Sequence, residues 1–286
     1  MFEMIINPKR SERKPWELFF VGFFYASLAV IMVNWMFAND AVLSKYSGIL
    51  VVTFAVMFSM PFVYYTLRME ELKDLEIKNS FRLLREHGKA LLAFLWLFLG
   101  FIMAFSVFYI VLDSTDNYKA QIETYCSINS PSNYQECVST YGVGAAESKV
   151  TGNAAGLQMF EAIFTNNLYV LMFTIVFSII FGAGGIFILA WNASVIAAAM
   201  VIFSKSNIMS LPLALARYMI HGVPEIAAYF IGTLAGGIIG LSIVRKEFKT
   251  DKFWDILHDS VLLIIGAIII IAAAALIEVF ITPKFF

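Results

Sequence analysis

The chain has 286 residues, of which 60% are hydrophobic and 14% are charged. Because soluble domains average about 45–50% apolar and about 25% charged residues, this composition excludes a soluble protein and predicts an integral membrane protein. The formal net charge is −1, so nothing in the charge balance points to a nucleic acid as a partner.

Apolar segments long enough to cross a bilayer follow one another along the chain, since a spanning helix needs about 20 mostly apolar residues. Five of them stand alone: 17–37, 47–67, 91–112, 225–244 and 260–281. The run 166–205 is twice as long as one span, and the glycines of "FGAGGIF" interrupt its centre. Because glycine adopts positive φ freely, we predict a tight turn between two helices, 166–182 and 186–205. The expected fold is an all-α, polytopic transmembrane bundle of about seven spans.

The basic residues test this number of spans, because Lys and Arg accumulate in cytoplasmic loops. Segments 1–16, 68–90 and 245–259 hold 14 of the 20 basic residues. These segments fall on one side only if the run 166–205 crosses the membrane twice. The sequence therefore predicts a multi-pass protein of the cell membrane, with a cytoplasmic N-terminus and an extracellular C-terminus.

The charged segment 68–90 is predicted to be a cytoplasmic helix, in which Asp74 and Lys78 are spaced to pair. Two interpretations remain open: a solvated extension of the second span, or a docking site for a cytoplasmic partner. His87 within this segment and His258 in the last inner loop are expected to be ordinary surface histidines.

Segment 113–165 is acidic and polar, and it is predicted to be an extracellular loop. It holds both cysteines of the chain, Cys126 and Cys137. An oxidising exterior favours a disulfide between them, and the alternative is two free thiols in a reducing compartment. The end of the loop is predicted to form a short amphipathic helix in the membrane interface. Its apolar stripe comprises Leu157, Phe160 and Phe164.

These features divide the chain into three regions. Residues 1–112 form an N-terminal region of three spans, residues 113–165 form the extracellular loop, and residues 166–286 form a core of four spans.

Ionisable side chains within the spans are few, and each is expected to face the bundle interior or a cavity. Insertion of such a group costs about 2.5–3.5 kcal/mol. The ionisable residues are Arg217, His221, Glu225 and, near a helix end, Glu278, and the amides are Asn34, Asn166, Asn167 and Asn192. Asn166 and Asn167 are interpreted as capping residues at the start of a helix.

The stretch 211–225 is predicted to be a broken or re-entrant element. Pro212 suits the first turn of a short helix, Gly222 suits its end, and Pro224 suits the first turn of the next helix. His221 and Glu225 should therefore flank a kink or a short re-entrant turn, within hydrogen-bonding reach of each other.

Small residues follow Glu225 at a spacing of four and lie on the same helix face. They are Ala228, Gly232, Gly236 and Gly240, here called the glycine ladder. This spacing lets a second helix approach closely. The partner is either the 166–205 hairpin or a second copy of the chain, which would make a homodimer.

Two interpretations of His221 and Glu225 stay open: a structural clasp, or a site for a proton or solute. A metal site is not predicted, because two possible ligands with no third nearby make a poor zinc centre. No nucleophile elbow or P-loop is present, so no catalytic residue and no cofactor are expected.

Three features follow one another in the C-terminal half. "NNLYV" at 166–170 opens a span, the glycine-rich turn is followed by Asn192, and "HGVPE" at 221–225 leads into the glycine ladder. Over 160–281 this order resembles the stage II sporulation protein M (SpoIIM) family. The N-terminal "NPKRSERKPWELFFVGFFYASLAV" and "REHGKALLAFLWLFLGF" are similar to its longer, archaeal-type members.

The resemblance implies a helical membrane bundle and marks a few positions as important. These are Asn166, Asn167, Asn192, His221, Gly222 and Glu225. The chain departs from the family where Ala193 follows Asn192, since members often have Asn-Gly there, and it adds two N-terminal spans and the acidic loop. In spore formers the family member resembles a platform that recruits cell-wall hydrolases, a role that the resemblance does not transfer to this chain.

We therefore expect a non-enzymatic scaffold whose partners, besides membrane lipid, are other membrane or extracellular proteins. The alternative is a transporter or transport subunit with a His/Glu site at a broken helix. An enzyme would need a nucleophile or a third metal ligand next to His221.

Overall fold

The computed structural model describes most of the chain. The described residues are 13–37, 39–40, 42–76, 80–112, 118–129, 133–143, 156–182, 184–204, 208–245 and 250–284. Within these ranges the chain is helical and contains no strand. Seven of the described helices are long and apolar enough to cross a membrane. The predicted all-α bundle with seven spans is confirmed.

The elements follow the chain in a simple order. The spans are α3 (Glu17–Phe37), α4 (Ser47–Glu76), α5 (Ser80–Leu112), α8 (Gly156–Phe181), α9 (Gly185–Ser204), α10 (Leu211–Val244) and α11 (Asp251–Phe280). The shorter elements are α6 (Lys119–Asn129), α7 (Tyr134–Val143) and the 3₁₀ turns η1 (Leu43–Tyr46), η4 (Ile208–Ser210) and η6 (Thr282–Lys284).

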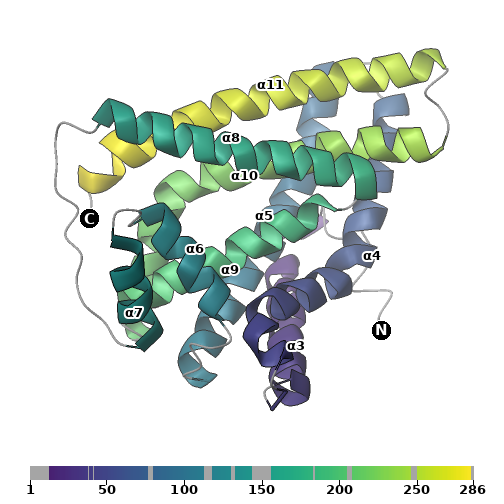
Figure 1. Ribbon diagram of the computed structural model, residues 1–286. Coiled ribbons are helices and arrows are strands. Elements are labelled where there is room, and N and C mark those ends of the chain that lie inside the picture. Colours follow the sequence, from purple (N-terminus) through teal and green to yellow (C-terminus); the bar gives the residue numbers. More distant parts are fainter. Residues whose placement is uncertain are drawn as a thin grey trace.

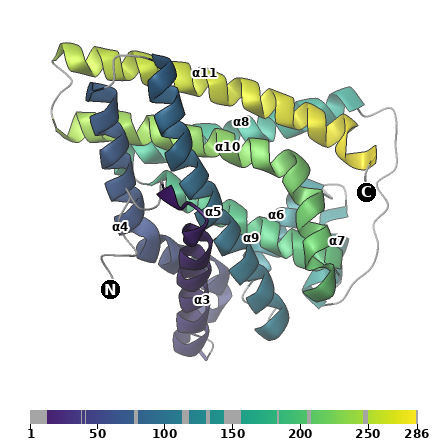
Figure 2. The same ribbon diagram turned by 180° about the vertical axis from the view of Figure 1, so that it is seen from behind.

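The spans form two groups that cross steeply. Helices α8, α10 and α11 lie alongside one another, α3, α4 and α5 cross them, and α9 packs on both groups (Figures 1 and 2). We call α6 and α7 together the lobe. The lobe packs on α9 at the end of the molecule where the chain terminates (Figure 1). Because successive spans reverse direction, the N-terminal end of α10 and the C-terminal end of α11 share this lobe side.

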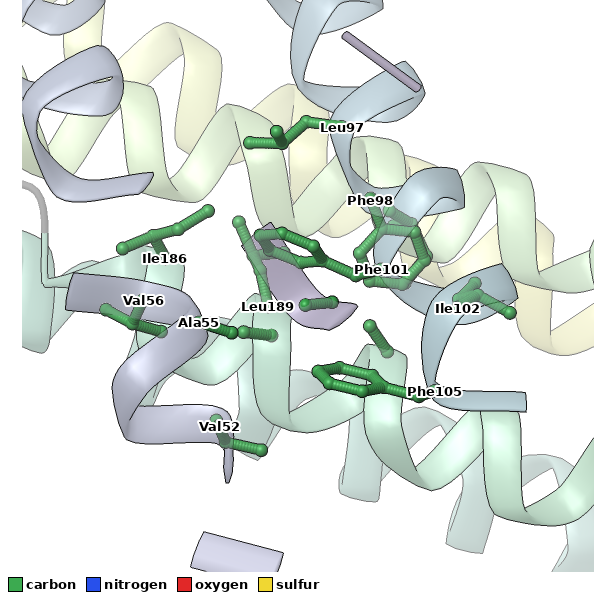
Figure 3. Close-up of a cluster of buried hydrophobic side chains, with 14 of the residues drawn as sticks. Val52, Ala55, Val56, Leu97, Phe98, Phe101, Ile102, Phe105, Ile186 and Leu189 are labelled. Carbon is green, nitrogen blue, oxygen red and sulfur yellow. The ribbon is translucent and has the colours of Figure 1, made fainter. Parts of the chain in front are cut away.

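The apolar core lies where α5 meets α4 and α9. Phe101 and Phe105 of α5 point towards Ala55 of α4 and Leu189 of α9 (Figure 3). Elsewhere α3 and α5 touch almost backbone to backbone, since a Cβ atom on Gly22 would overlap the carbonyl of Leu97. Lipid is as apolar as these side chains, so close packing rather than water exclusion holds such helices together.

Large apolar side chains remain exposed along the outside of the bundle. Phe20 on α3, Phe173 on α8 and Ile269 on α11 are all more than half exposed. Exposed apolar side chains of this kind suit contact with lipid chains, as the composition predicts.

The turn between the two halves of the run 166–205 forms as predicted. Gly182 adopts a φ of 65°, a conformation that other residues rarely take, and α9 starts at Gly185. The chain therefore crosses twice within this run.

The segment 68–90 is not one helix. Its first part, up to Glu76, continues α4 as the expected extension of the second span, but residues from Ser80 onward belong to α5. Apolar residues at helical spacing continue from both neighbouring spans into segment 68–90. The segment therefore has the sequence pattern of a single helix. The predicted pair of Asp74 and Lys78 lies outside the described side chains.

Two predictions at the start of α8 are wrong. This helix begins at Gly156 and runs unbroken to Phe181, so the apolar stripe that starts at Leu157 is its first part and not a separate interfacial helix. Asn166 and Asn167 lie within the helix instead of capping it. Contacts that Asn167 makes with α10, described below, override the weak preference of asparagine for helix ends.

Helix α10 begins next to Pro212 as predicted, but it does not end at Gly222. It continues through Pro224 and bends, as Figure 2 shows, so the kink is confirmed and a re-entrant turn is not formed. A proline inside a helix removes one backbone hydrogen bond and crowds the preceding turn, which produces a bend. Packing against α8 and α11 stabilises the helix on both sides of it.

Candidate functional site

A cluster of polar side chains joins α8, α10 and α11 around the bend of α10. Its members, which we call the clasp, are Asn167 of α8, His221, Glu225 and Tyr229 of α10, Glu278 of α11 and Thr282 of η6. The α10 members are four residues apart and share one helix face, as do Glu278 and Thr282. Helices α10 and α11 are antiparallel neighbours, so these two faces meet.

The side-chain amide of Asn167 holds the centre of the clasp. Its Nδ2 donates to Glu225 Oε1 at 2.6 Å, and its Oδ1 accepts from the Tyr229 hydroxyl at 2.9 Å. Asn167 is 7% exposed and Tyr229 is 2% exposed. One α8 side chain is thus fixed between two successive turns of α10, which ties the helices together at a defined register. The neighbouring residue Asn166 is exposed and is not a member of the clasp.

His221 faces α11 rather than Glu225. Its Nδ1 lies 3.3 Å from the hydroxyl of Thr282, and its Nε2 lies 3.8 Å from Glu278 Oε1. No hydrogen bond between His221 and Glu225 is present among the described contacts, so the predicted pair is wrong. Glu225 contacts Asn167 of α8 and Glu278 of α11, and His221 contacts the end of α11 only.

Glu278 completes the clasp, although its sequence position suggested only an ionisable residue near a helix end. Its carboxyl group forms a side-chain hydrogen bond with that of Glu225. The signal was present, since Glu278 is one of four ionisable residues in the spans and Thr282 follows it by four positions. Tyr229 carried no such signal, because a tyrosine among apolar residues is common in membrane helices.

Three of the predicted site residues stand apart from the clasp. Asn192 donates to the Ile188 carbonyl of its own helix at 2.8 Å. The Arg217 guanidinium lies over the Phe203 ring, 4.7 Å from its centroid. Gly222 is buried, but a Cβ atom there would only touch Met219 at 3.4 Å, so close packing does not require glycine at this position.

The glycine ladder faces α8 of the same chain. A Cβ atom on Gly236 would lie 2.7 Å from the carbonyl oxygen of Ile175, and one on Gly240 would lie 2.5 Å from that of Ile179. These distances are too short for any side chain. The ladder therefore packs on the 166–205 hairpin, the first of the two predicted partners, and this face is occupied within the chain.

A second polar cluster, here called the charged cluster, lies on the opposite side of the bundle. Glu70 of α4 is fully buried and accepts from Lys73 Nζ at 2.7 Å, and its other oxygen lies 2.8 Å from His87 Nδ1 of α5. Arg245 at the end of α10 donates to buried Glu71 at 2.9 Å. These pairs join the ends of three helices.

His87 is thus a buried residue, 2% exposed, and the prediction of a surface histidine is wrong. Its partner Glu70 is 17 residues away on another helix. A pairing of this kind follows from helix packing and leaves no periodic trace in the sequence. His258 is exposed, as predicted.

The lobe contains an internal disulfide and is hydrogen-bonded to the spans. A disulfide joins Cys126 of α6 to Cys137 of α7, as predicted. The buried amide of Gln121 donates to the Gly48 carbonyl of α4 at 3.0 Å and lies 3.2 Å from Ser194 Oγ of α9. The segment expected to be an acidic loop therefore contains two packed helices.

Tyr118, just before α6, fixes the lobe to a third span. Its hydroxyl donates to the Phe105 carbonyl of α5 at 3.0 Å, and burial raises the pKa of the phenol well above its usual range. Tyr118 therefore stays protonated and remains a hydrogen-bond donor.

Neither cluster forms a metal centre. Across the described residues, no group of three or more His, Cys, Asp or Glu side chains is arranged to hold a metal ion. What the clasp offers chemically is a set of hydrogen-bonding groups with two neighbouring carboxyls and one imidazole.

Comparison with known proteins identifies a family and a relative in an archaeon. The sequence model of the family described as stage II sporulation protein M matches residues 17–283. An uncharacterised protein of the archaeon Methanocaldococcus jannaschii is 36% identical over 131 residues, which are 44% of this chain and 71% of that protein. No solved structure matches.

Proposed function

The chain belongs to the stage II sporulation protein M family, and we propose that it is a non-enzymatic membrane scaffold that binds a partner protein at its lobe. The partner is a membrane or extracellular protein. The observation that carries this proposal is the attachment of the lobe to three different spans, α4, α5 and α9, through Tyr118 and Gln121.

This attachment supports a binding role because it fixes the shape of the lobe before a partner arrives. Gln121 and Cys126 are fully or almost fully buried, and the disulfide to Cys137 limits movement of α7 against α6. A surface that is already ordered loses less conformational entropy on binding than a mobile loop does.

The exposed side chains on the lobe and directly before α7 are polar or charged. They are Lys119, Ser127, Asn133, Gln135, Glu136 and Ser139. Such groups can donate and accept hydrogen bonds, which suits recognition of another protein.

The clasp and the charged cluster support the same role, because they stiffen the frame that carries the lobe. Asn167 ties α8 to α10 on the lobe side, and Glu70 with His87 ties α4 to α5 on the other side. In this proposal the intramembrane polar groups hold the frame rather than bind a solute.

We further propose that the lobe lies outside the cell. Lys and Arg accumulate in cytoplasmic loops, so in this proposal the basic segments and the N-terminus lie inside and the C-terminus lies outside. The disulfide agrees with this orientation, since such bonds persist in oxidising compartments.

The test compares partners recovered from native membranes by three forms of the tagged chain: wild type, Glu136→Arg and Asp255→Arg. Both variants reverse one exposed acidic side chain, but Asp255 lies on the side opposite the lobe. We expect wild type and Asp255→Arg to recover the same proteins and Glu136→Arg to lose at least one of them. Equal recovery by all three forms, or recovery of no partner by wild type, would contradict the proposal.

A second candidate function is transport, and the neighbouring carboxyls at the α10 bend favour it. Transporters place ion sites where a spanning helix is interrupted, and the Glu278 side chain is 31% exposed. If this candidate holds, Glu225→Gln should abolish proton-coupled uptake in liposomes. Unchanged uptake would remove Glu225 from any such mechanism.

A further inference from the structure

Two carboxyl groups meet between α10 and α11, and their contact involves a shared proton. A side-chain hydrogen bond joins Glu225 to Glu278. An ionised carboxylate only accepts hydrogen bonds, so a bond between two carboxyls requires a proton on one of them. Two adjacent negative charges in an apolar bundle would also repel strongly. A hydrogen bond between Glu225 and Glu278 therefore requires one shared proton on the pair.

His221 presents a nitrogen to the same pair. The Thr282 hydroxyl donates to the Ile277 carbonyl at 3.3 Å, so its oxygen is left to accept from His221 Nδ1–H. In a neutral imidazole with its proton on Nδ1, Nε2 carries none and can take one. This nitrogen lies 3.8 Å from Glu278 Oε1. A second proton acceptor thus stands beside the carboxyl pair.

The remaining neighbours are polar groups that do not exchange protons readily. From α8, Asn167 donates to Glu225, and from α10, Tyr229 donates to Asn167. Arg217 lies one helical turn before His221 and is the described cation nearest to it along α10. Asn167 and Tyr229 thus orient Glu225, while Arg217 lies over the Phe203 ring. The mobile proton is left to Glu225, Glu278 and His221.

Access to the pair differs on its two sides. His221 and Glu278 lie near the lobe-side ends of α10 and α11, and their side chains are 13% and 31% exposed. Away from these ends, Gly232 and Gly236 pack against Leu171 and Ile175 of α8 with no room for a Cβ atom. A proton can therefore reach the pair from the lobe side and meets a tightly packed helix interface beyond it.

We propose that Glu225, Glu278 and His221 form a proton-binding site that exchanges with the lobe side only. The shared proton holds the bend of α10 against the end of α11. Its loss leaves two carboxylates that repel each other and opens this contact. The site does not depend on the scaffold role, because none of its residues lies in the lobe.

The first test detects the proton by infrared spectroscopy on the full chain in liposomes. Wild type should show the C=O stretch of a protonated carboxyl at neutral pH, and Glu225→Gln and Glu278→Gln should each lose it. Glu161→Gln, which alters an exposed carboxyl on α8, should keep it. Retention of the band in both clasp variants would overturn the proposal.

The second test needs no variant, so it decides even if the glutamine variants fail to fold. Wild type is inserted in one orientation, and the pH is raised on one side at a time with impermeant buffers. We expect loss of the band when the lobe side is made alkaline and no change when the other side is. Loss from the other side, or from neither side, would overturn one-sided exchange.

Discussion

Asn167 Nδ2 donates to Glu225 Oε1 at 2.6 Å, across a sequence separation of 58 residues. The same amide accepts from Tyr229, so one side chain of α8 satisfies two polar groups of α10 inside the bundle. This contact decides where α8 and α10 meet, because a shift of either helix by one residue would leave buried polar atoms without partners.

Asn167→Ala should destabilise the protein by about 1–3 kcal/mol, since it removes the partner of two buried polar groups. Thermal unfolding in detergent measures the loss as a lower Tm. Asn192→Ala is the matched control, because the amide of Asn192 bonds only within its own helix among the described contacts. An equally large decrease of Tm in the control would show that the contacts of Asn167 between helices add no stability of their own.

Gly236→Ala should destabilise the bundle by about 1–3 kcal/mol, because its Cβ atom would press on the Ile175 carbonyl. Gly266→Ala in α11 serves as the control, since a Cβ atom there meets nothing within 4 Å. Alanine is the better helix former, so that variant should be neutral or slightly more stable. Both variants are compared by unfolding in the same detergent, and a stable Gly236→Ala protein would mean that α8 does not occupy the ladder.

His87→Leu should lower the free energy of unfolding by about 1–3 kcal/mol, because buried Glu70 keeps Lys73 but loses its contact with the imidazole. His258→Leu, at an exposed histidine, should leave Tm unchanged. If the two variants behave alike in thermal unfolding, the charged cluster does not join α4 and α5.

Cys126→Ser combined with Cys137→Ser should loosen the lobe more than the spans. A disulfide typically stabilises by about 2–4 kcal/mol, and here it joins only α6 and α7. Limited proteolysis should therefore cut the lobe of the variant faster, while the span fragments stay intact. Cleavage at the wild-type rate would show that the contacts of Gln121 and Tyr118 hold the lobe without the disulfide.

The sequence predicts the features that depend on neighbouring residues. Apolar length predicts the spans, and "FGAGG" predicts the turn at Gly182. Four-residue spacing predicts which face of α10 packs closely, and two cysteines in a polar segment predict the disulfide. Each of these signals lies within a single element or turn.

The contacts of the clasp and the charged cluster could not be predicted in the same way. Glu225 meets Glu278, and Glu70 meets His87, only after the helices have packed. The end predicted for a helix at Gly222 was wrong for a related reason. Local preferences favour a break there, but packing on α8 and α11 keeps α10 continuous through its bend.

The claim that the lobe binds a partner is tested most directly by a photo-crosslinking residue placed at Gln135 and, in a separate protein, at Asp255. Both positions are exposed, and only the first lies on the lobe. After irradiation of native membranes, we predict a distinct crosslinked protein from position 135 and none of that mass from position 255. Identical patterns from the two positions, or no crosslink at 135, would contradict the scaffold role.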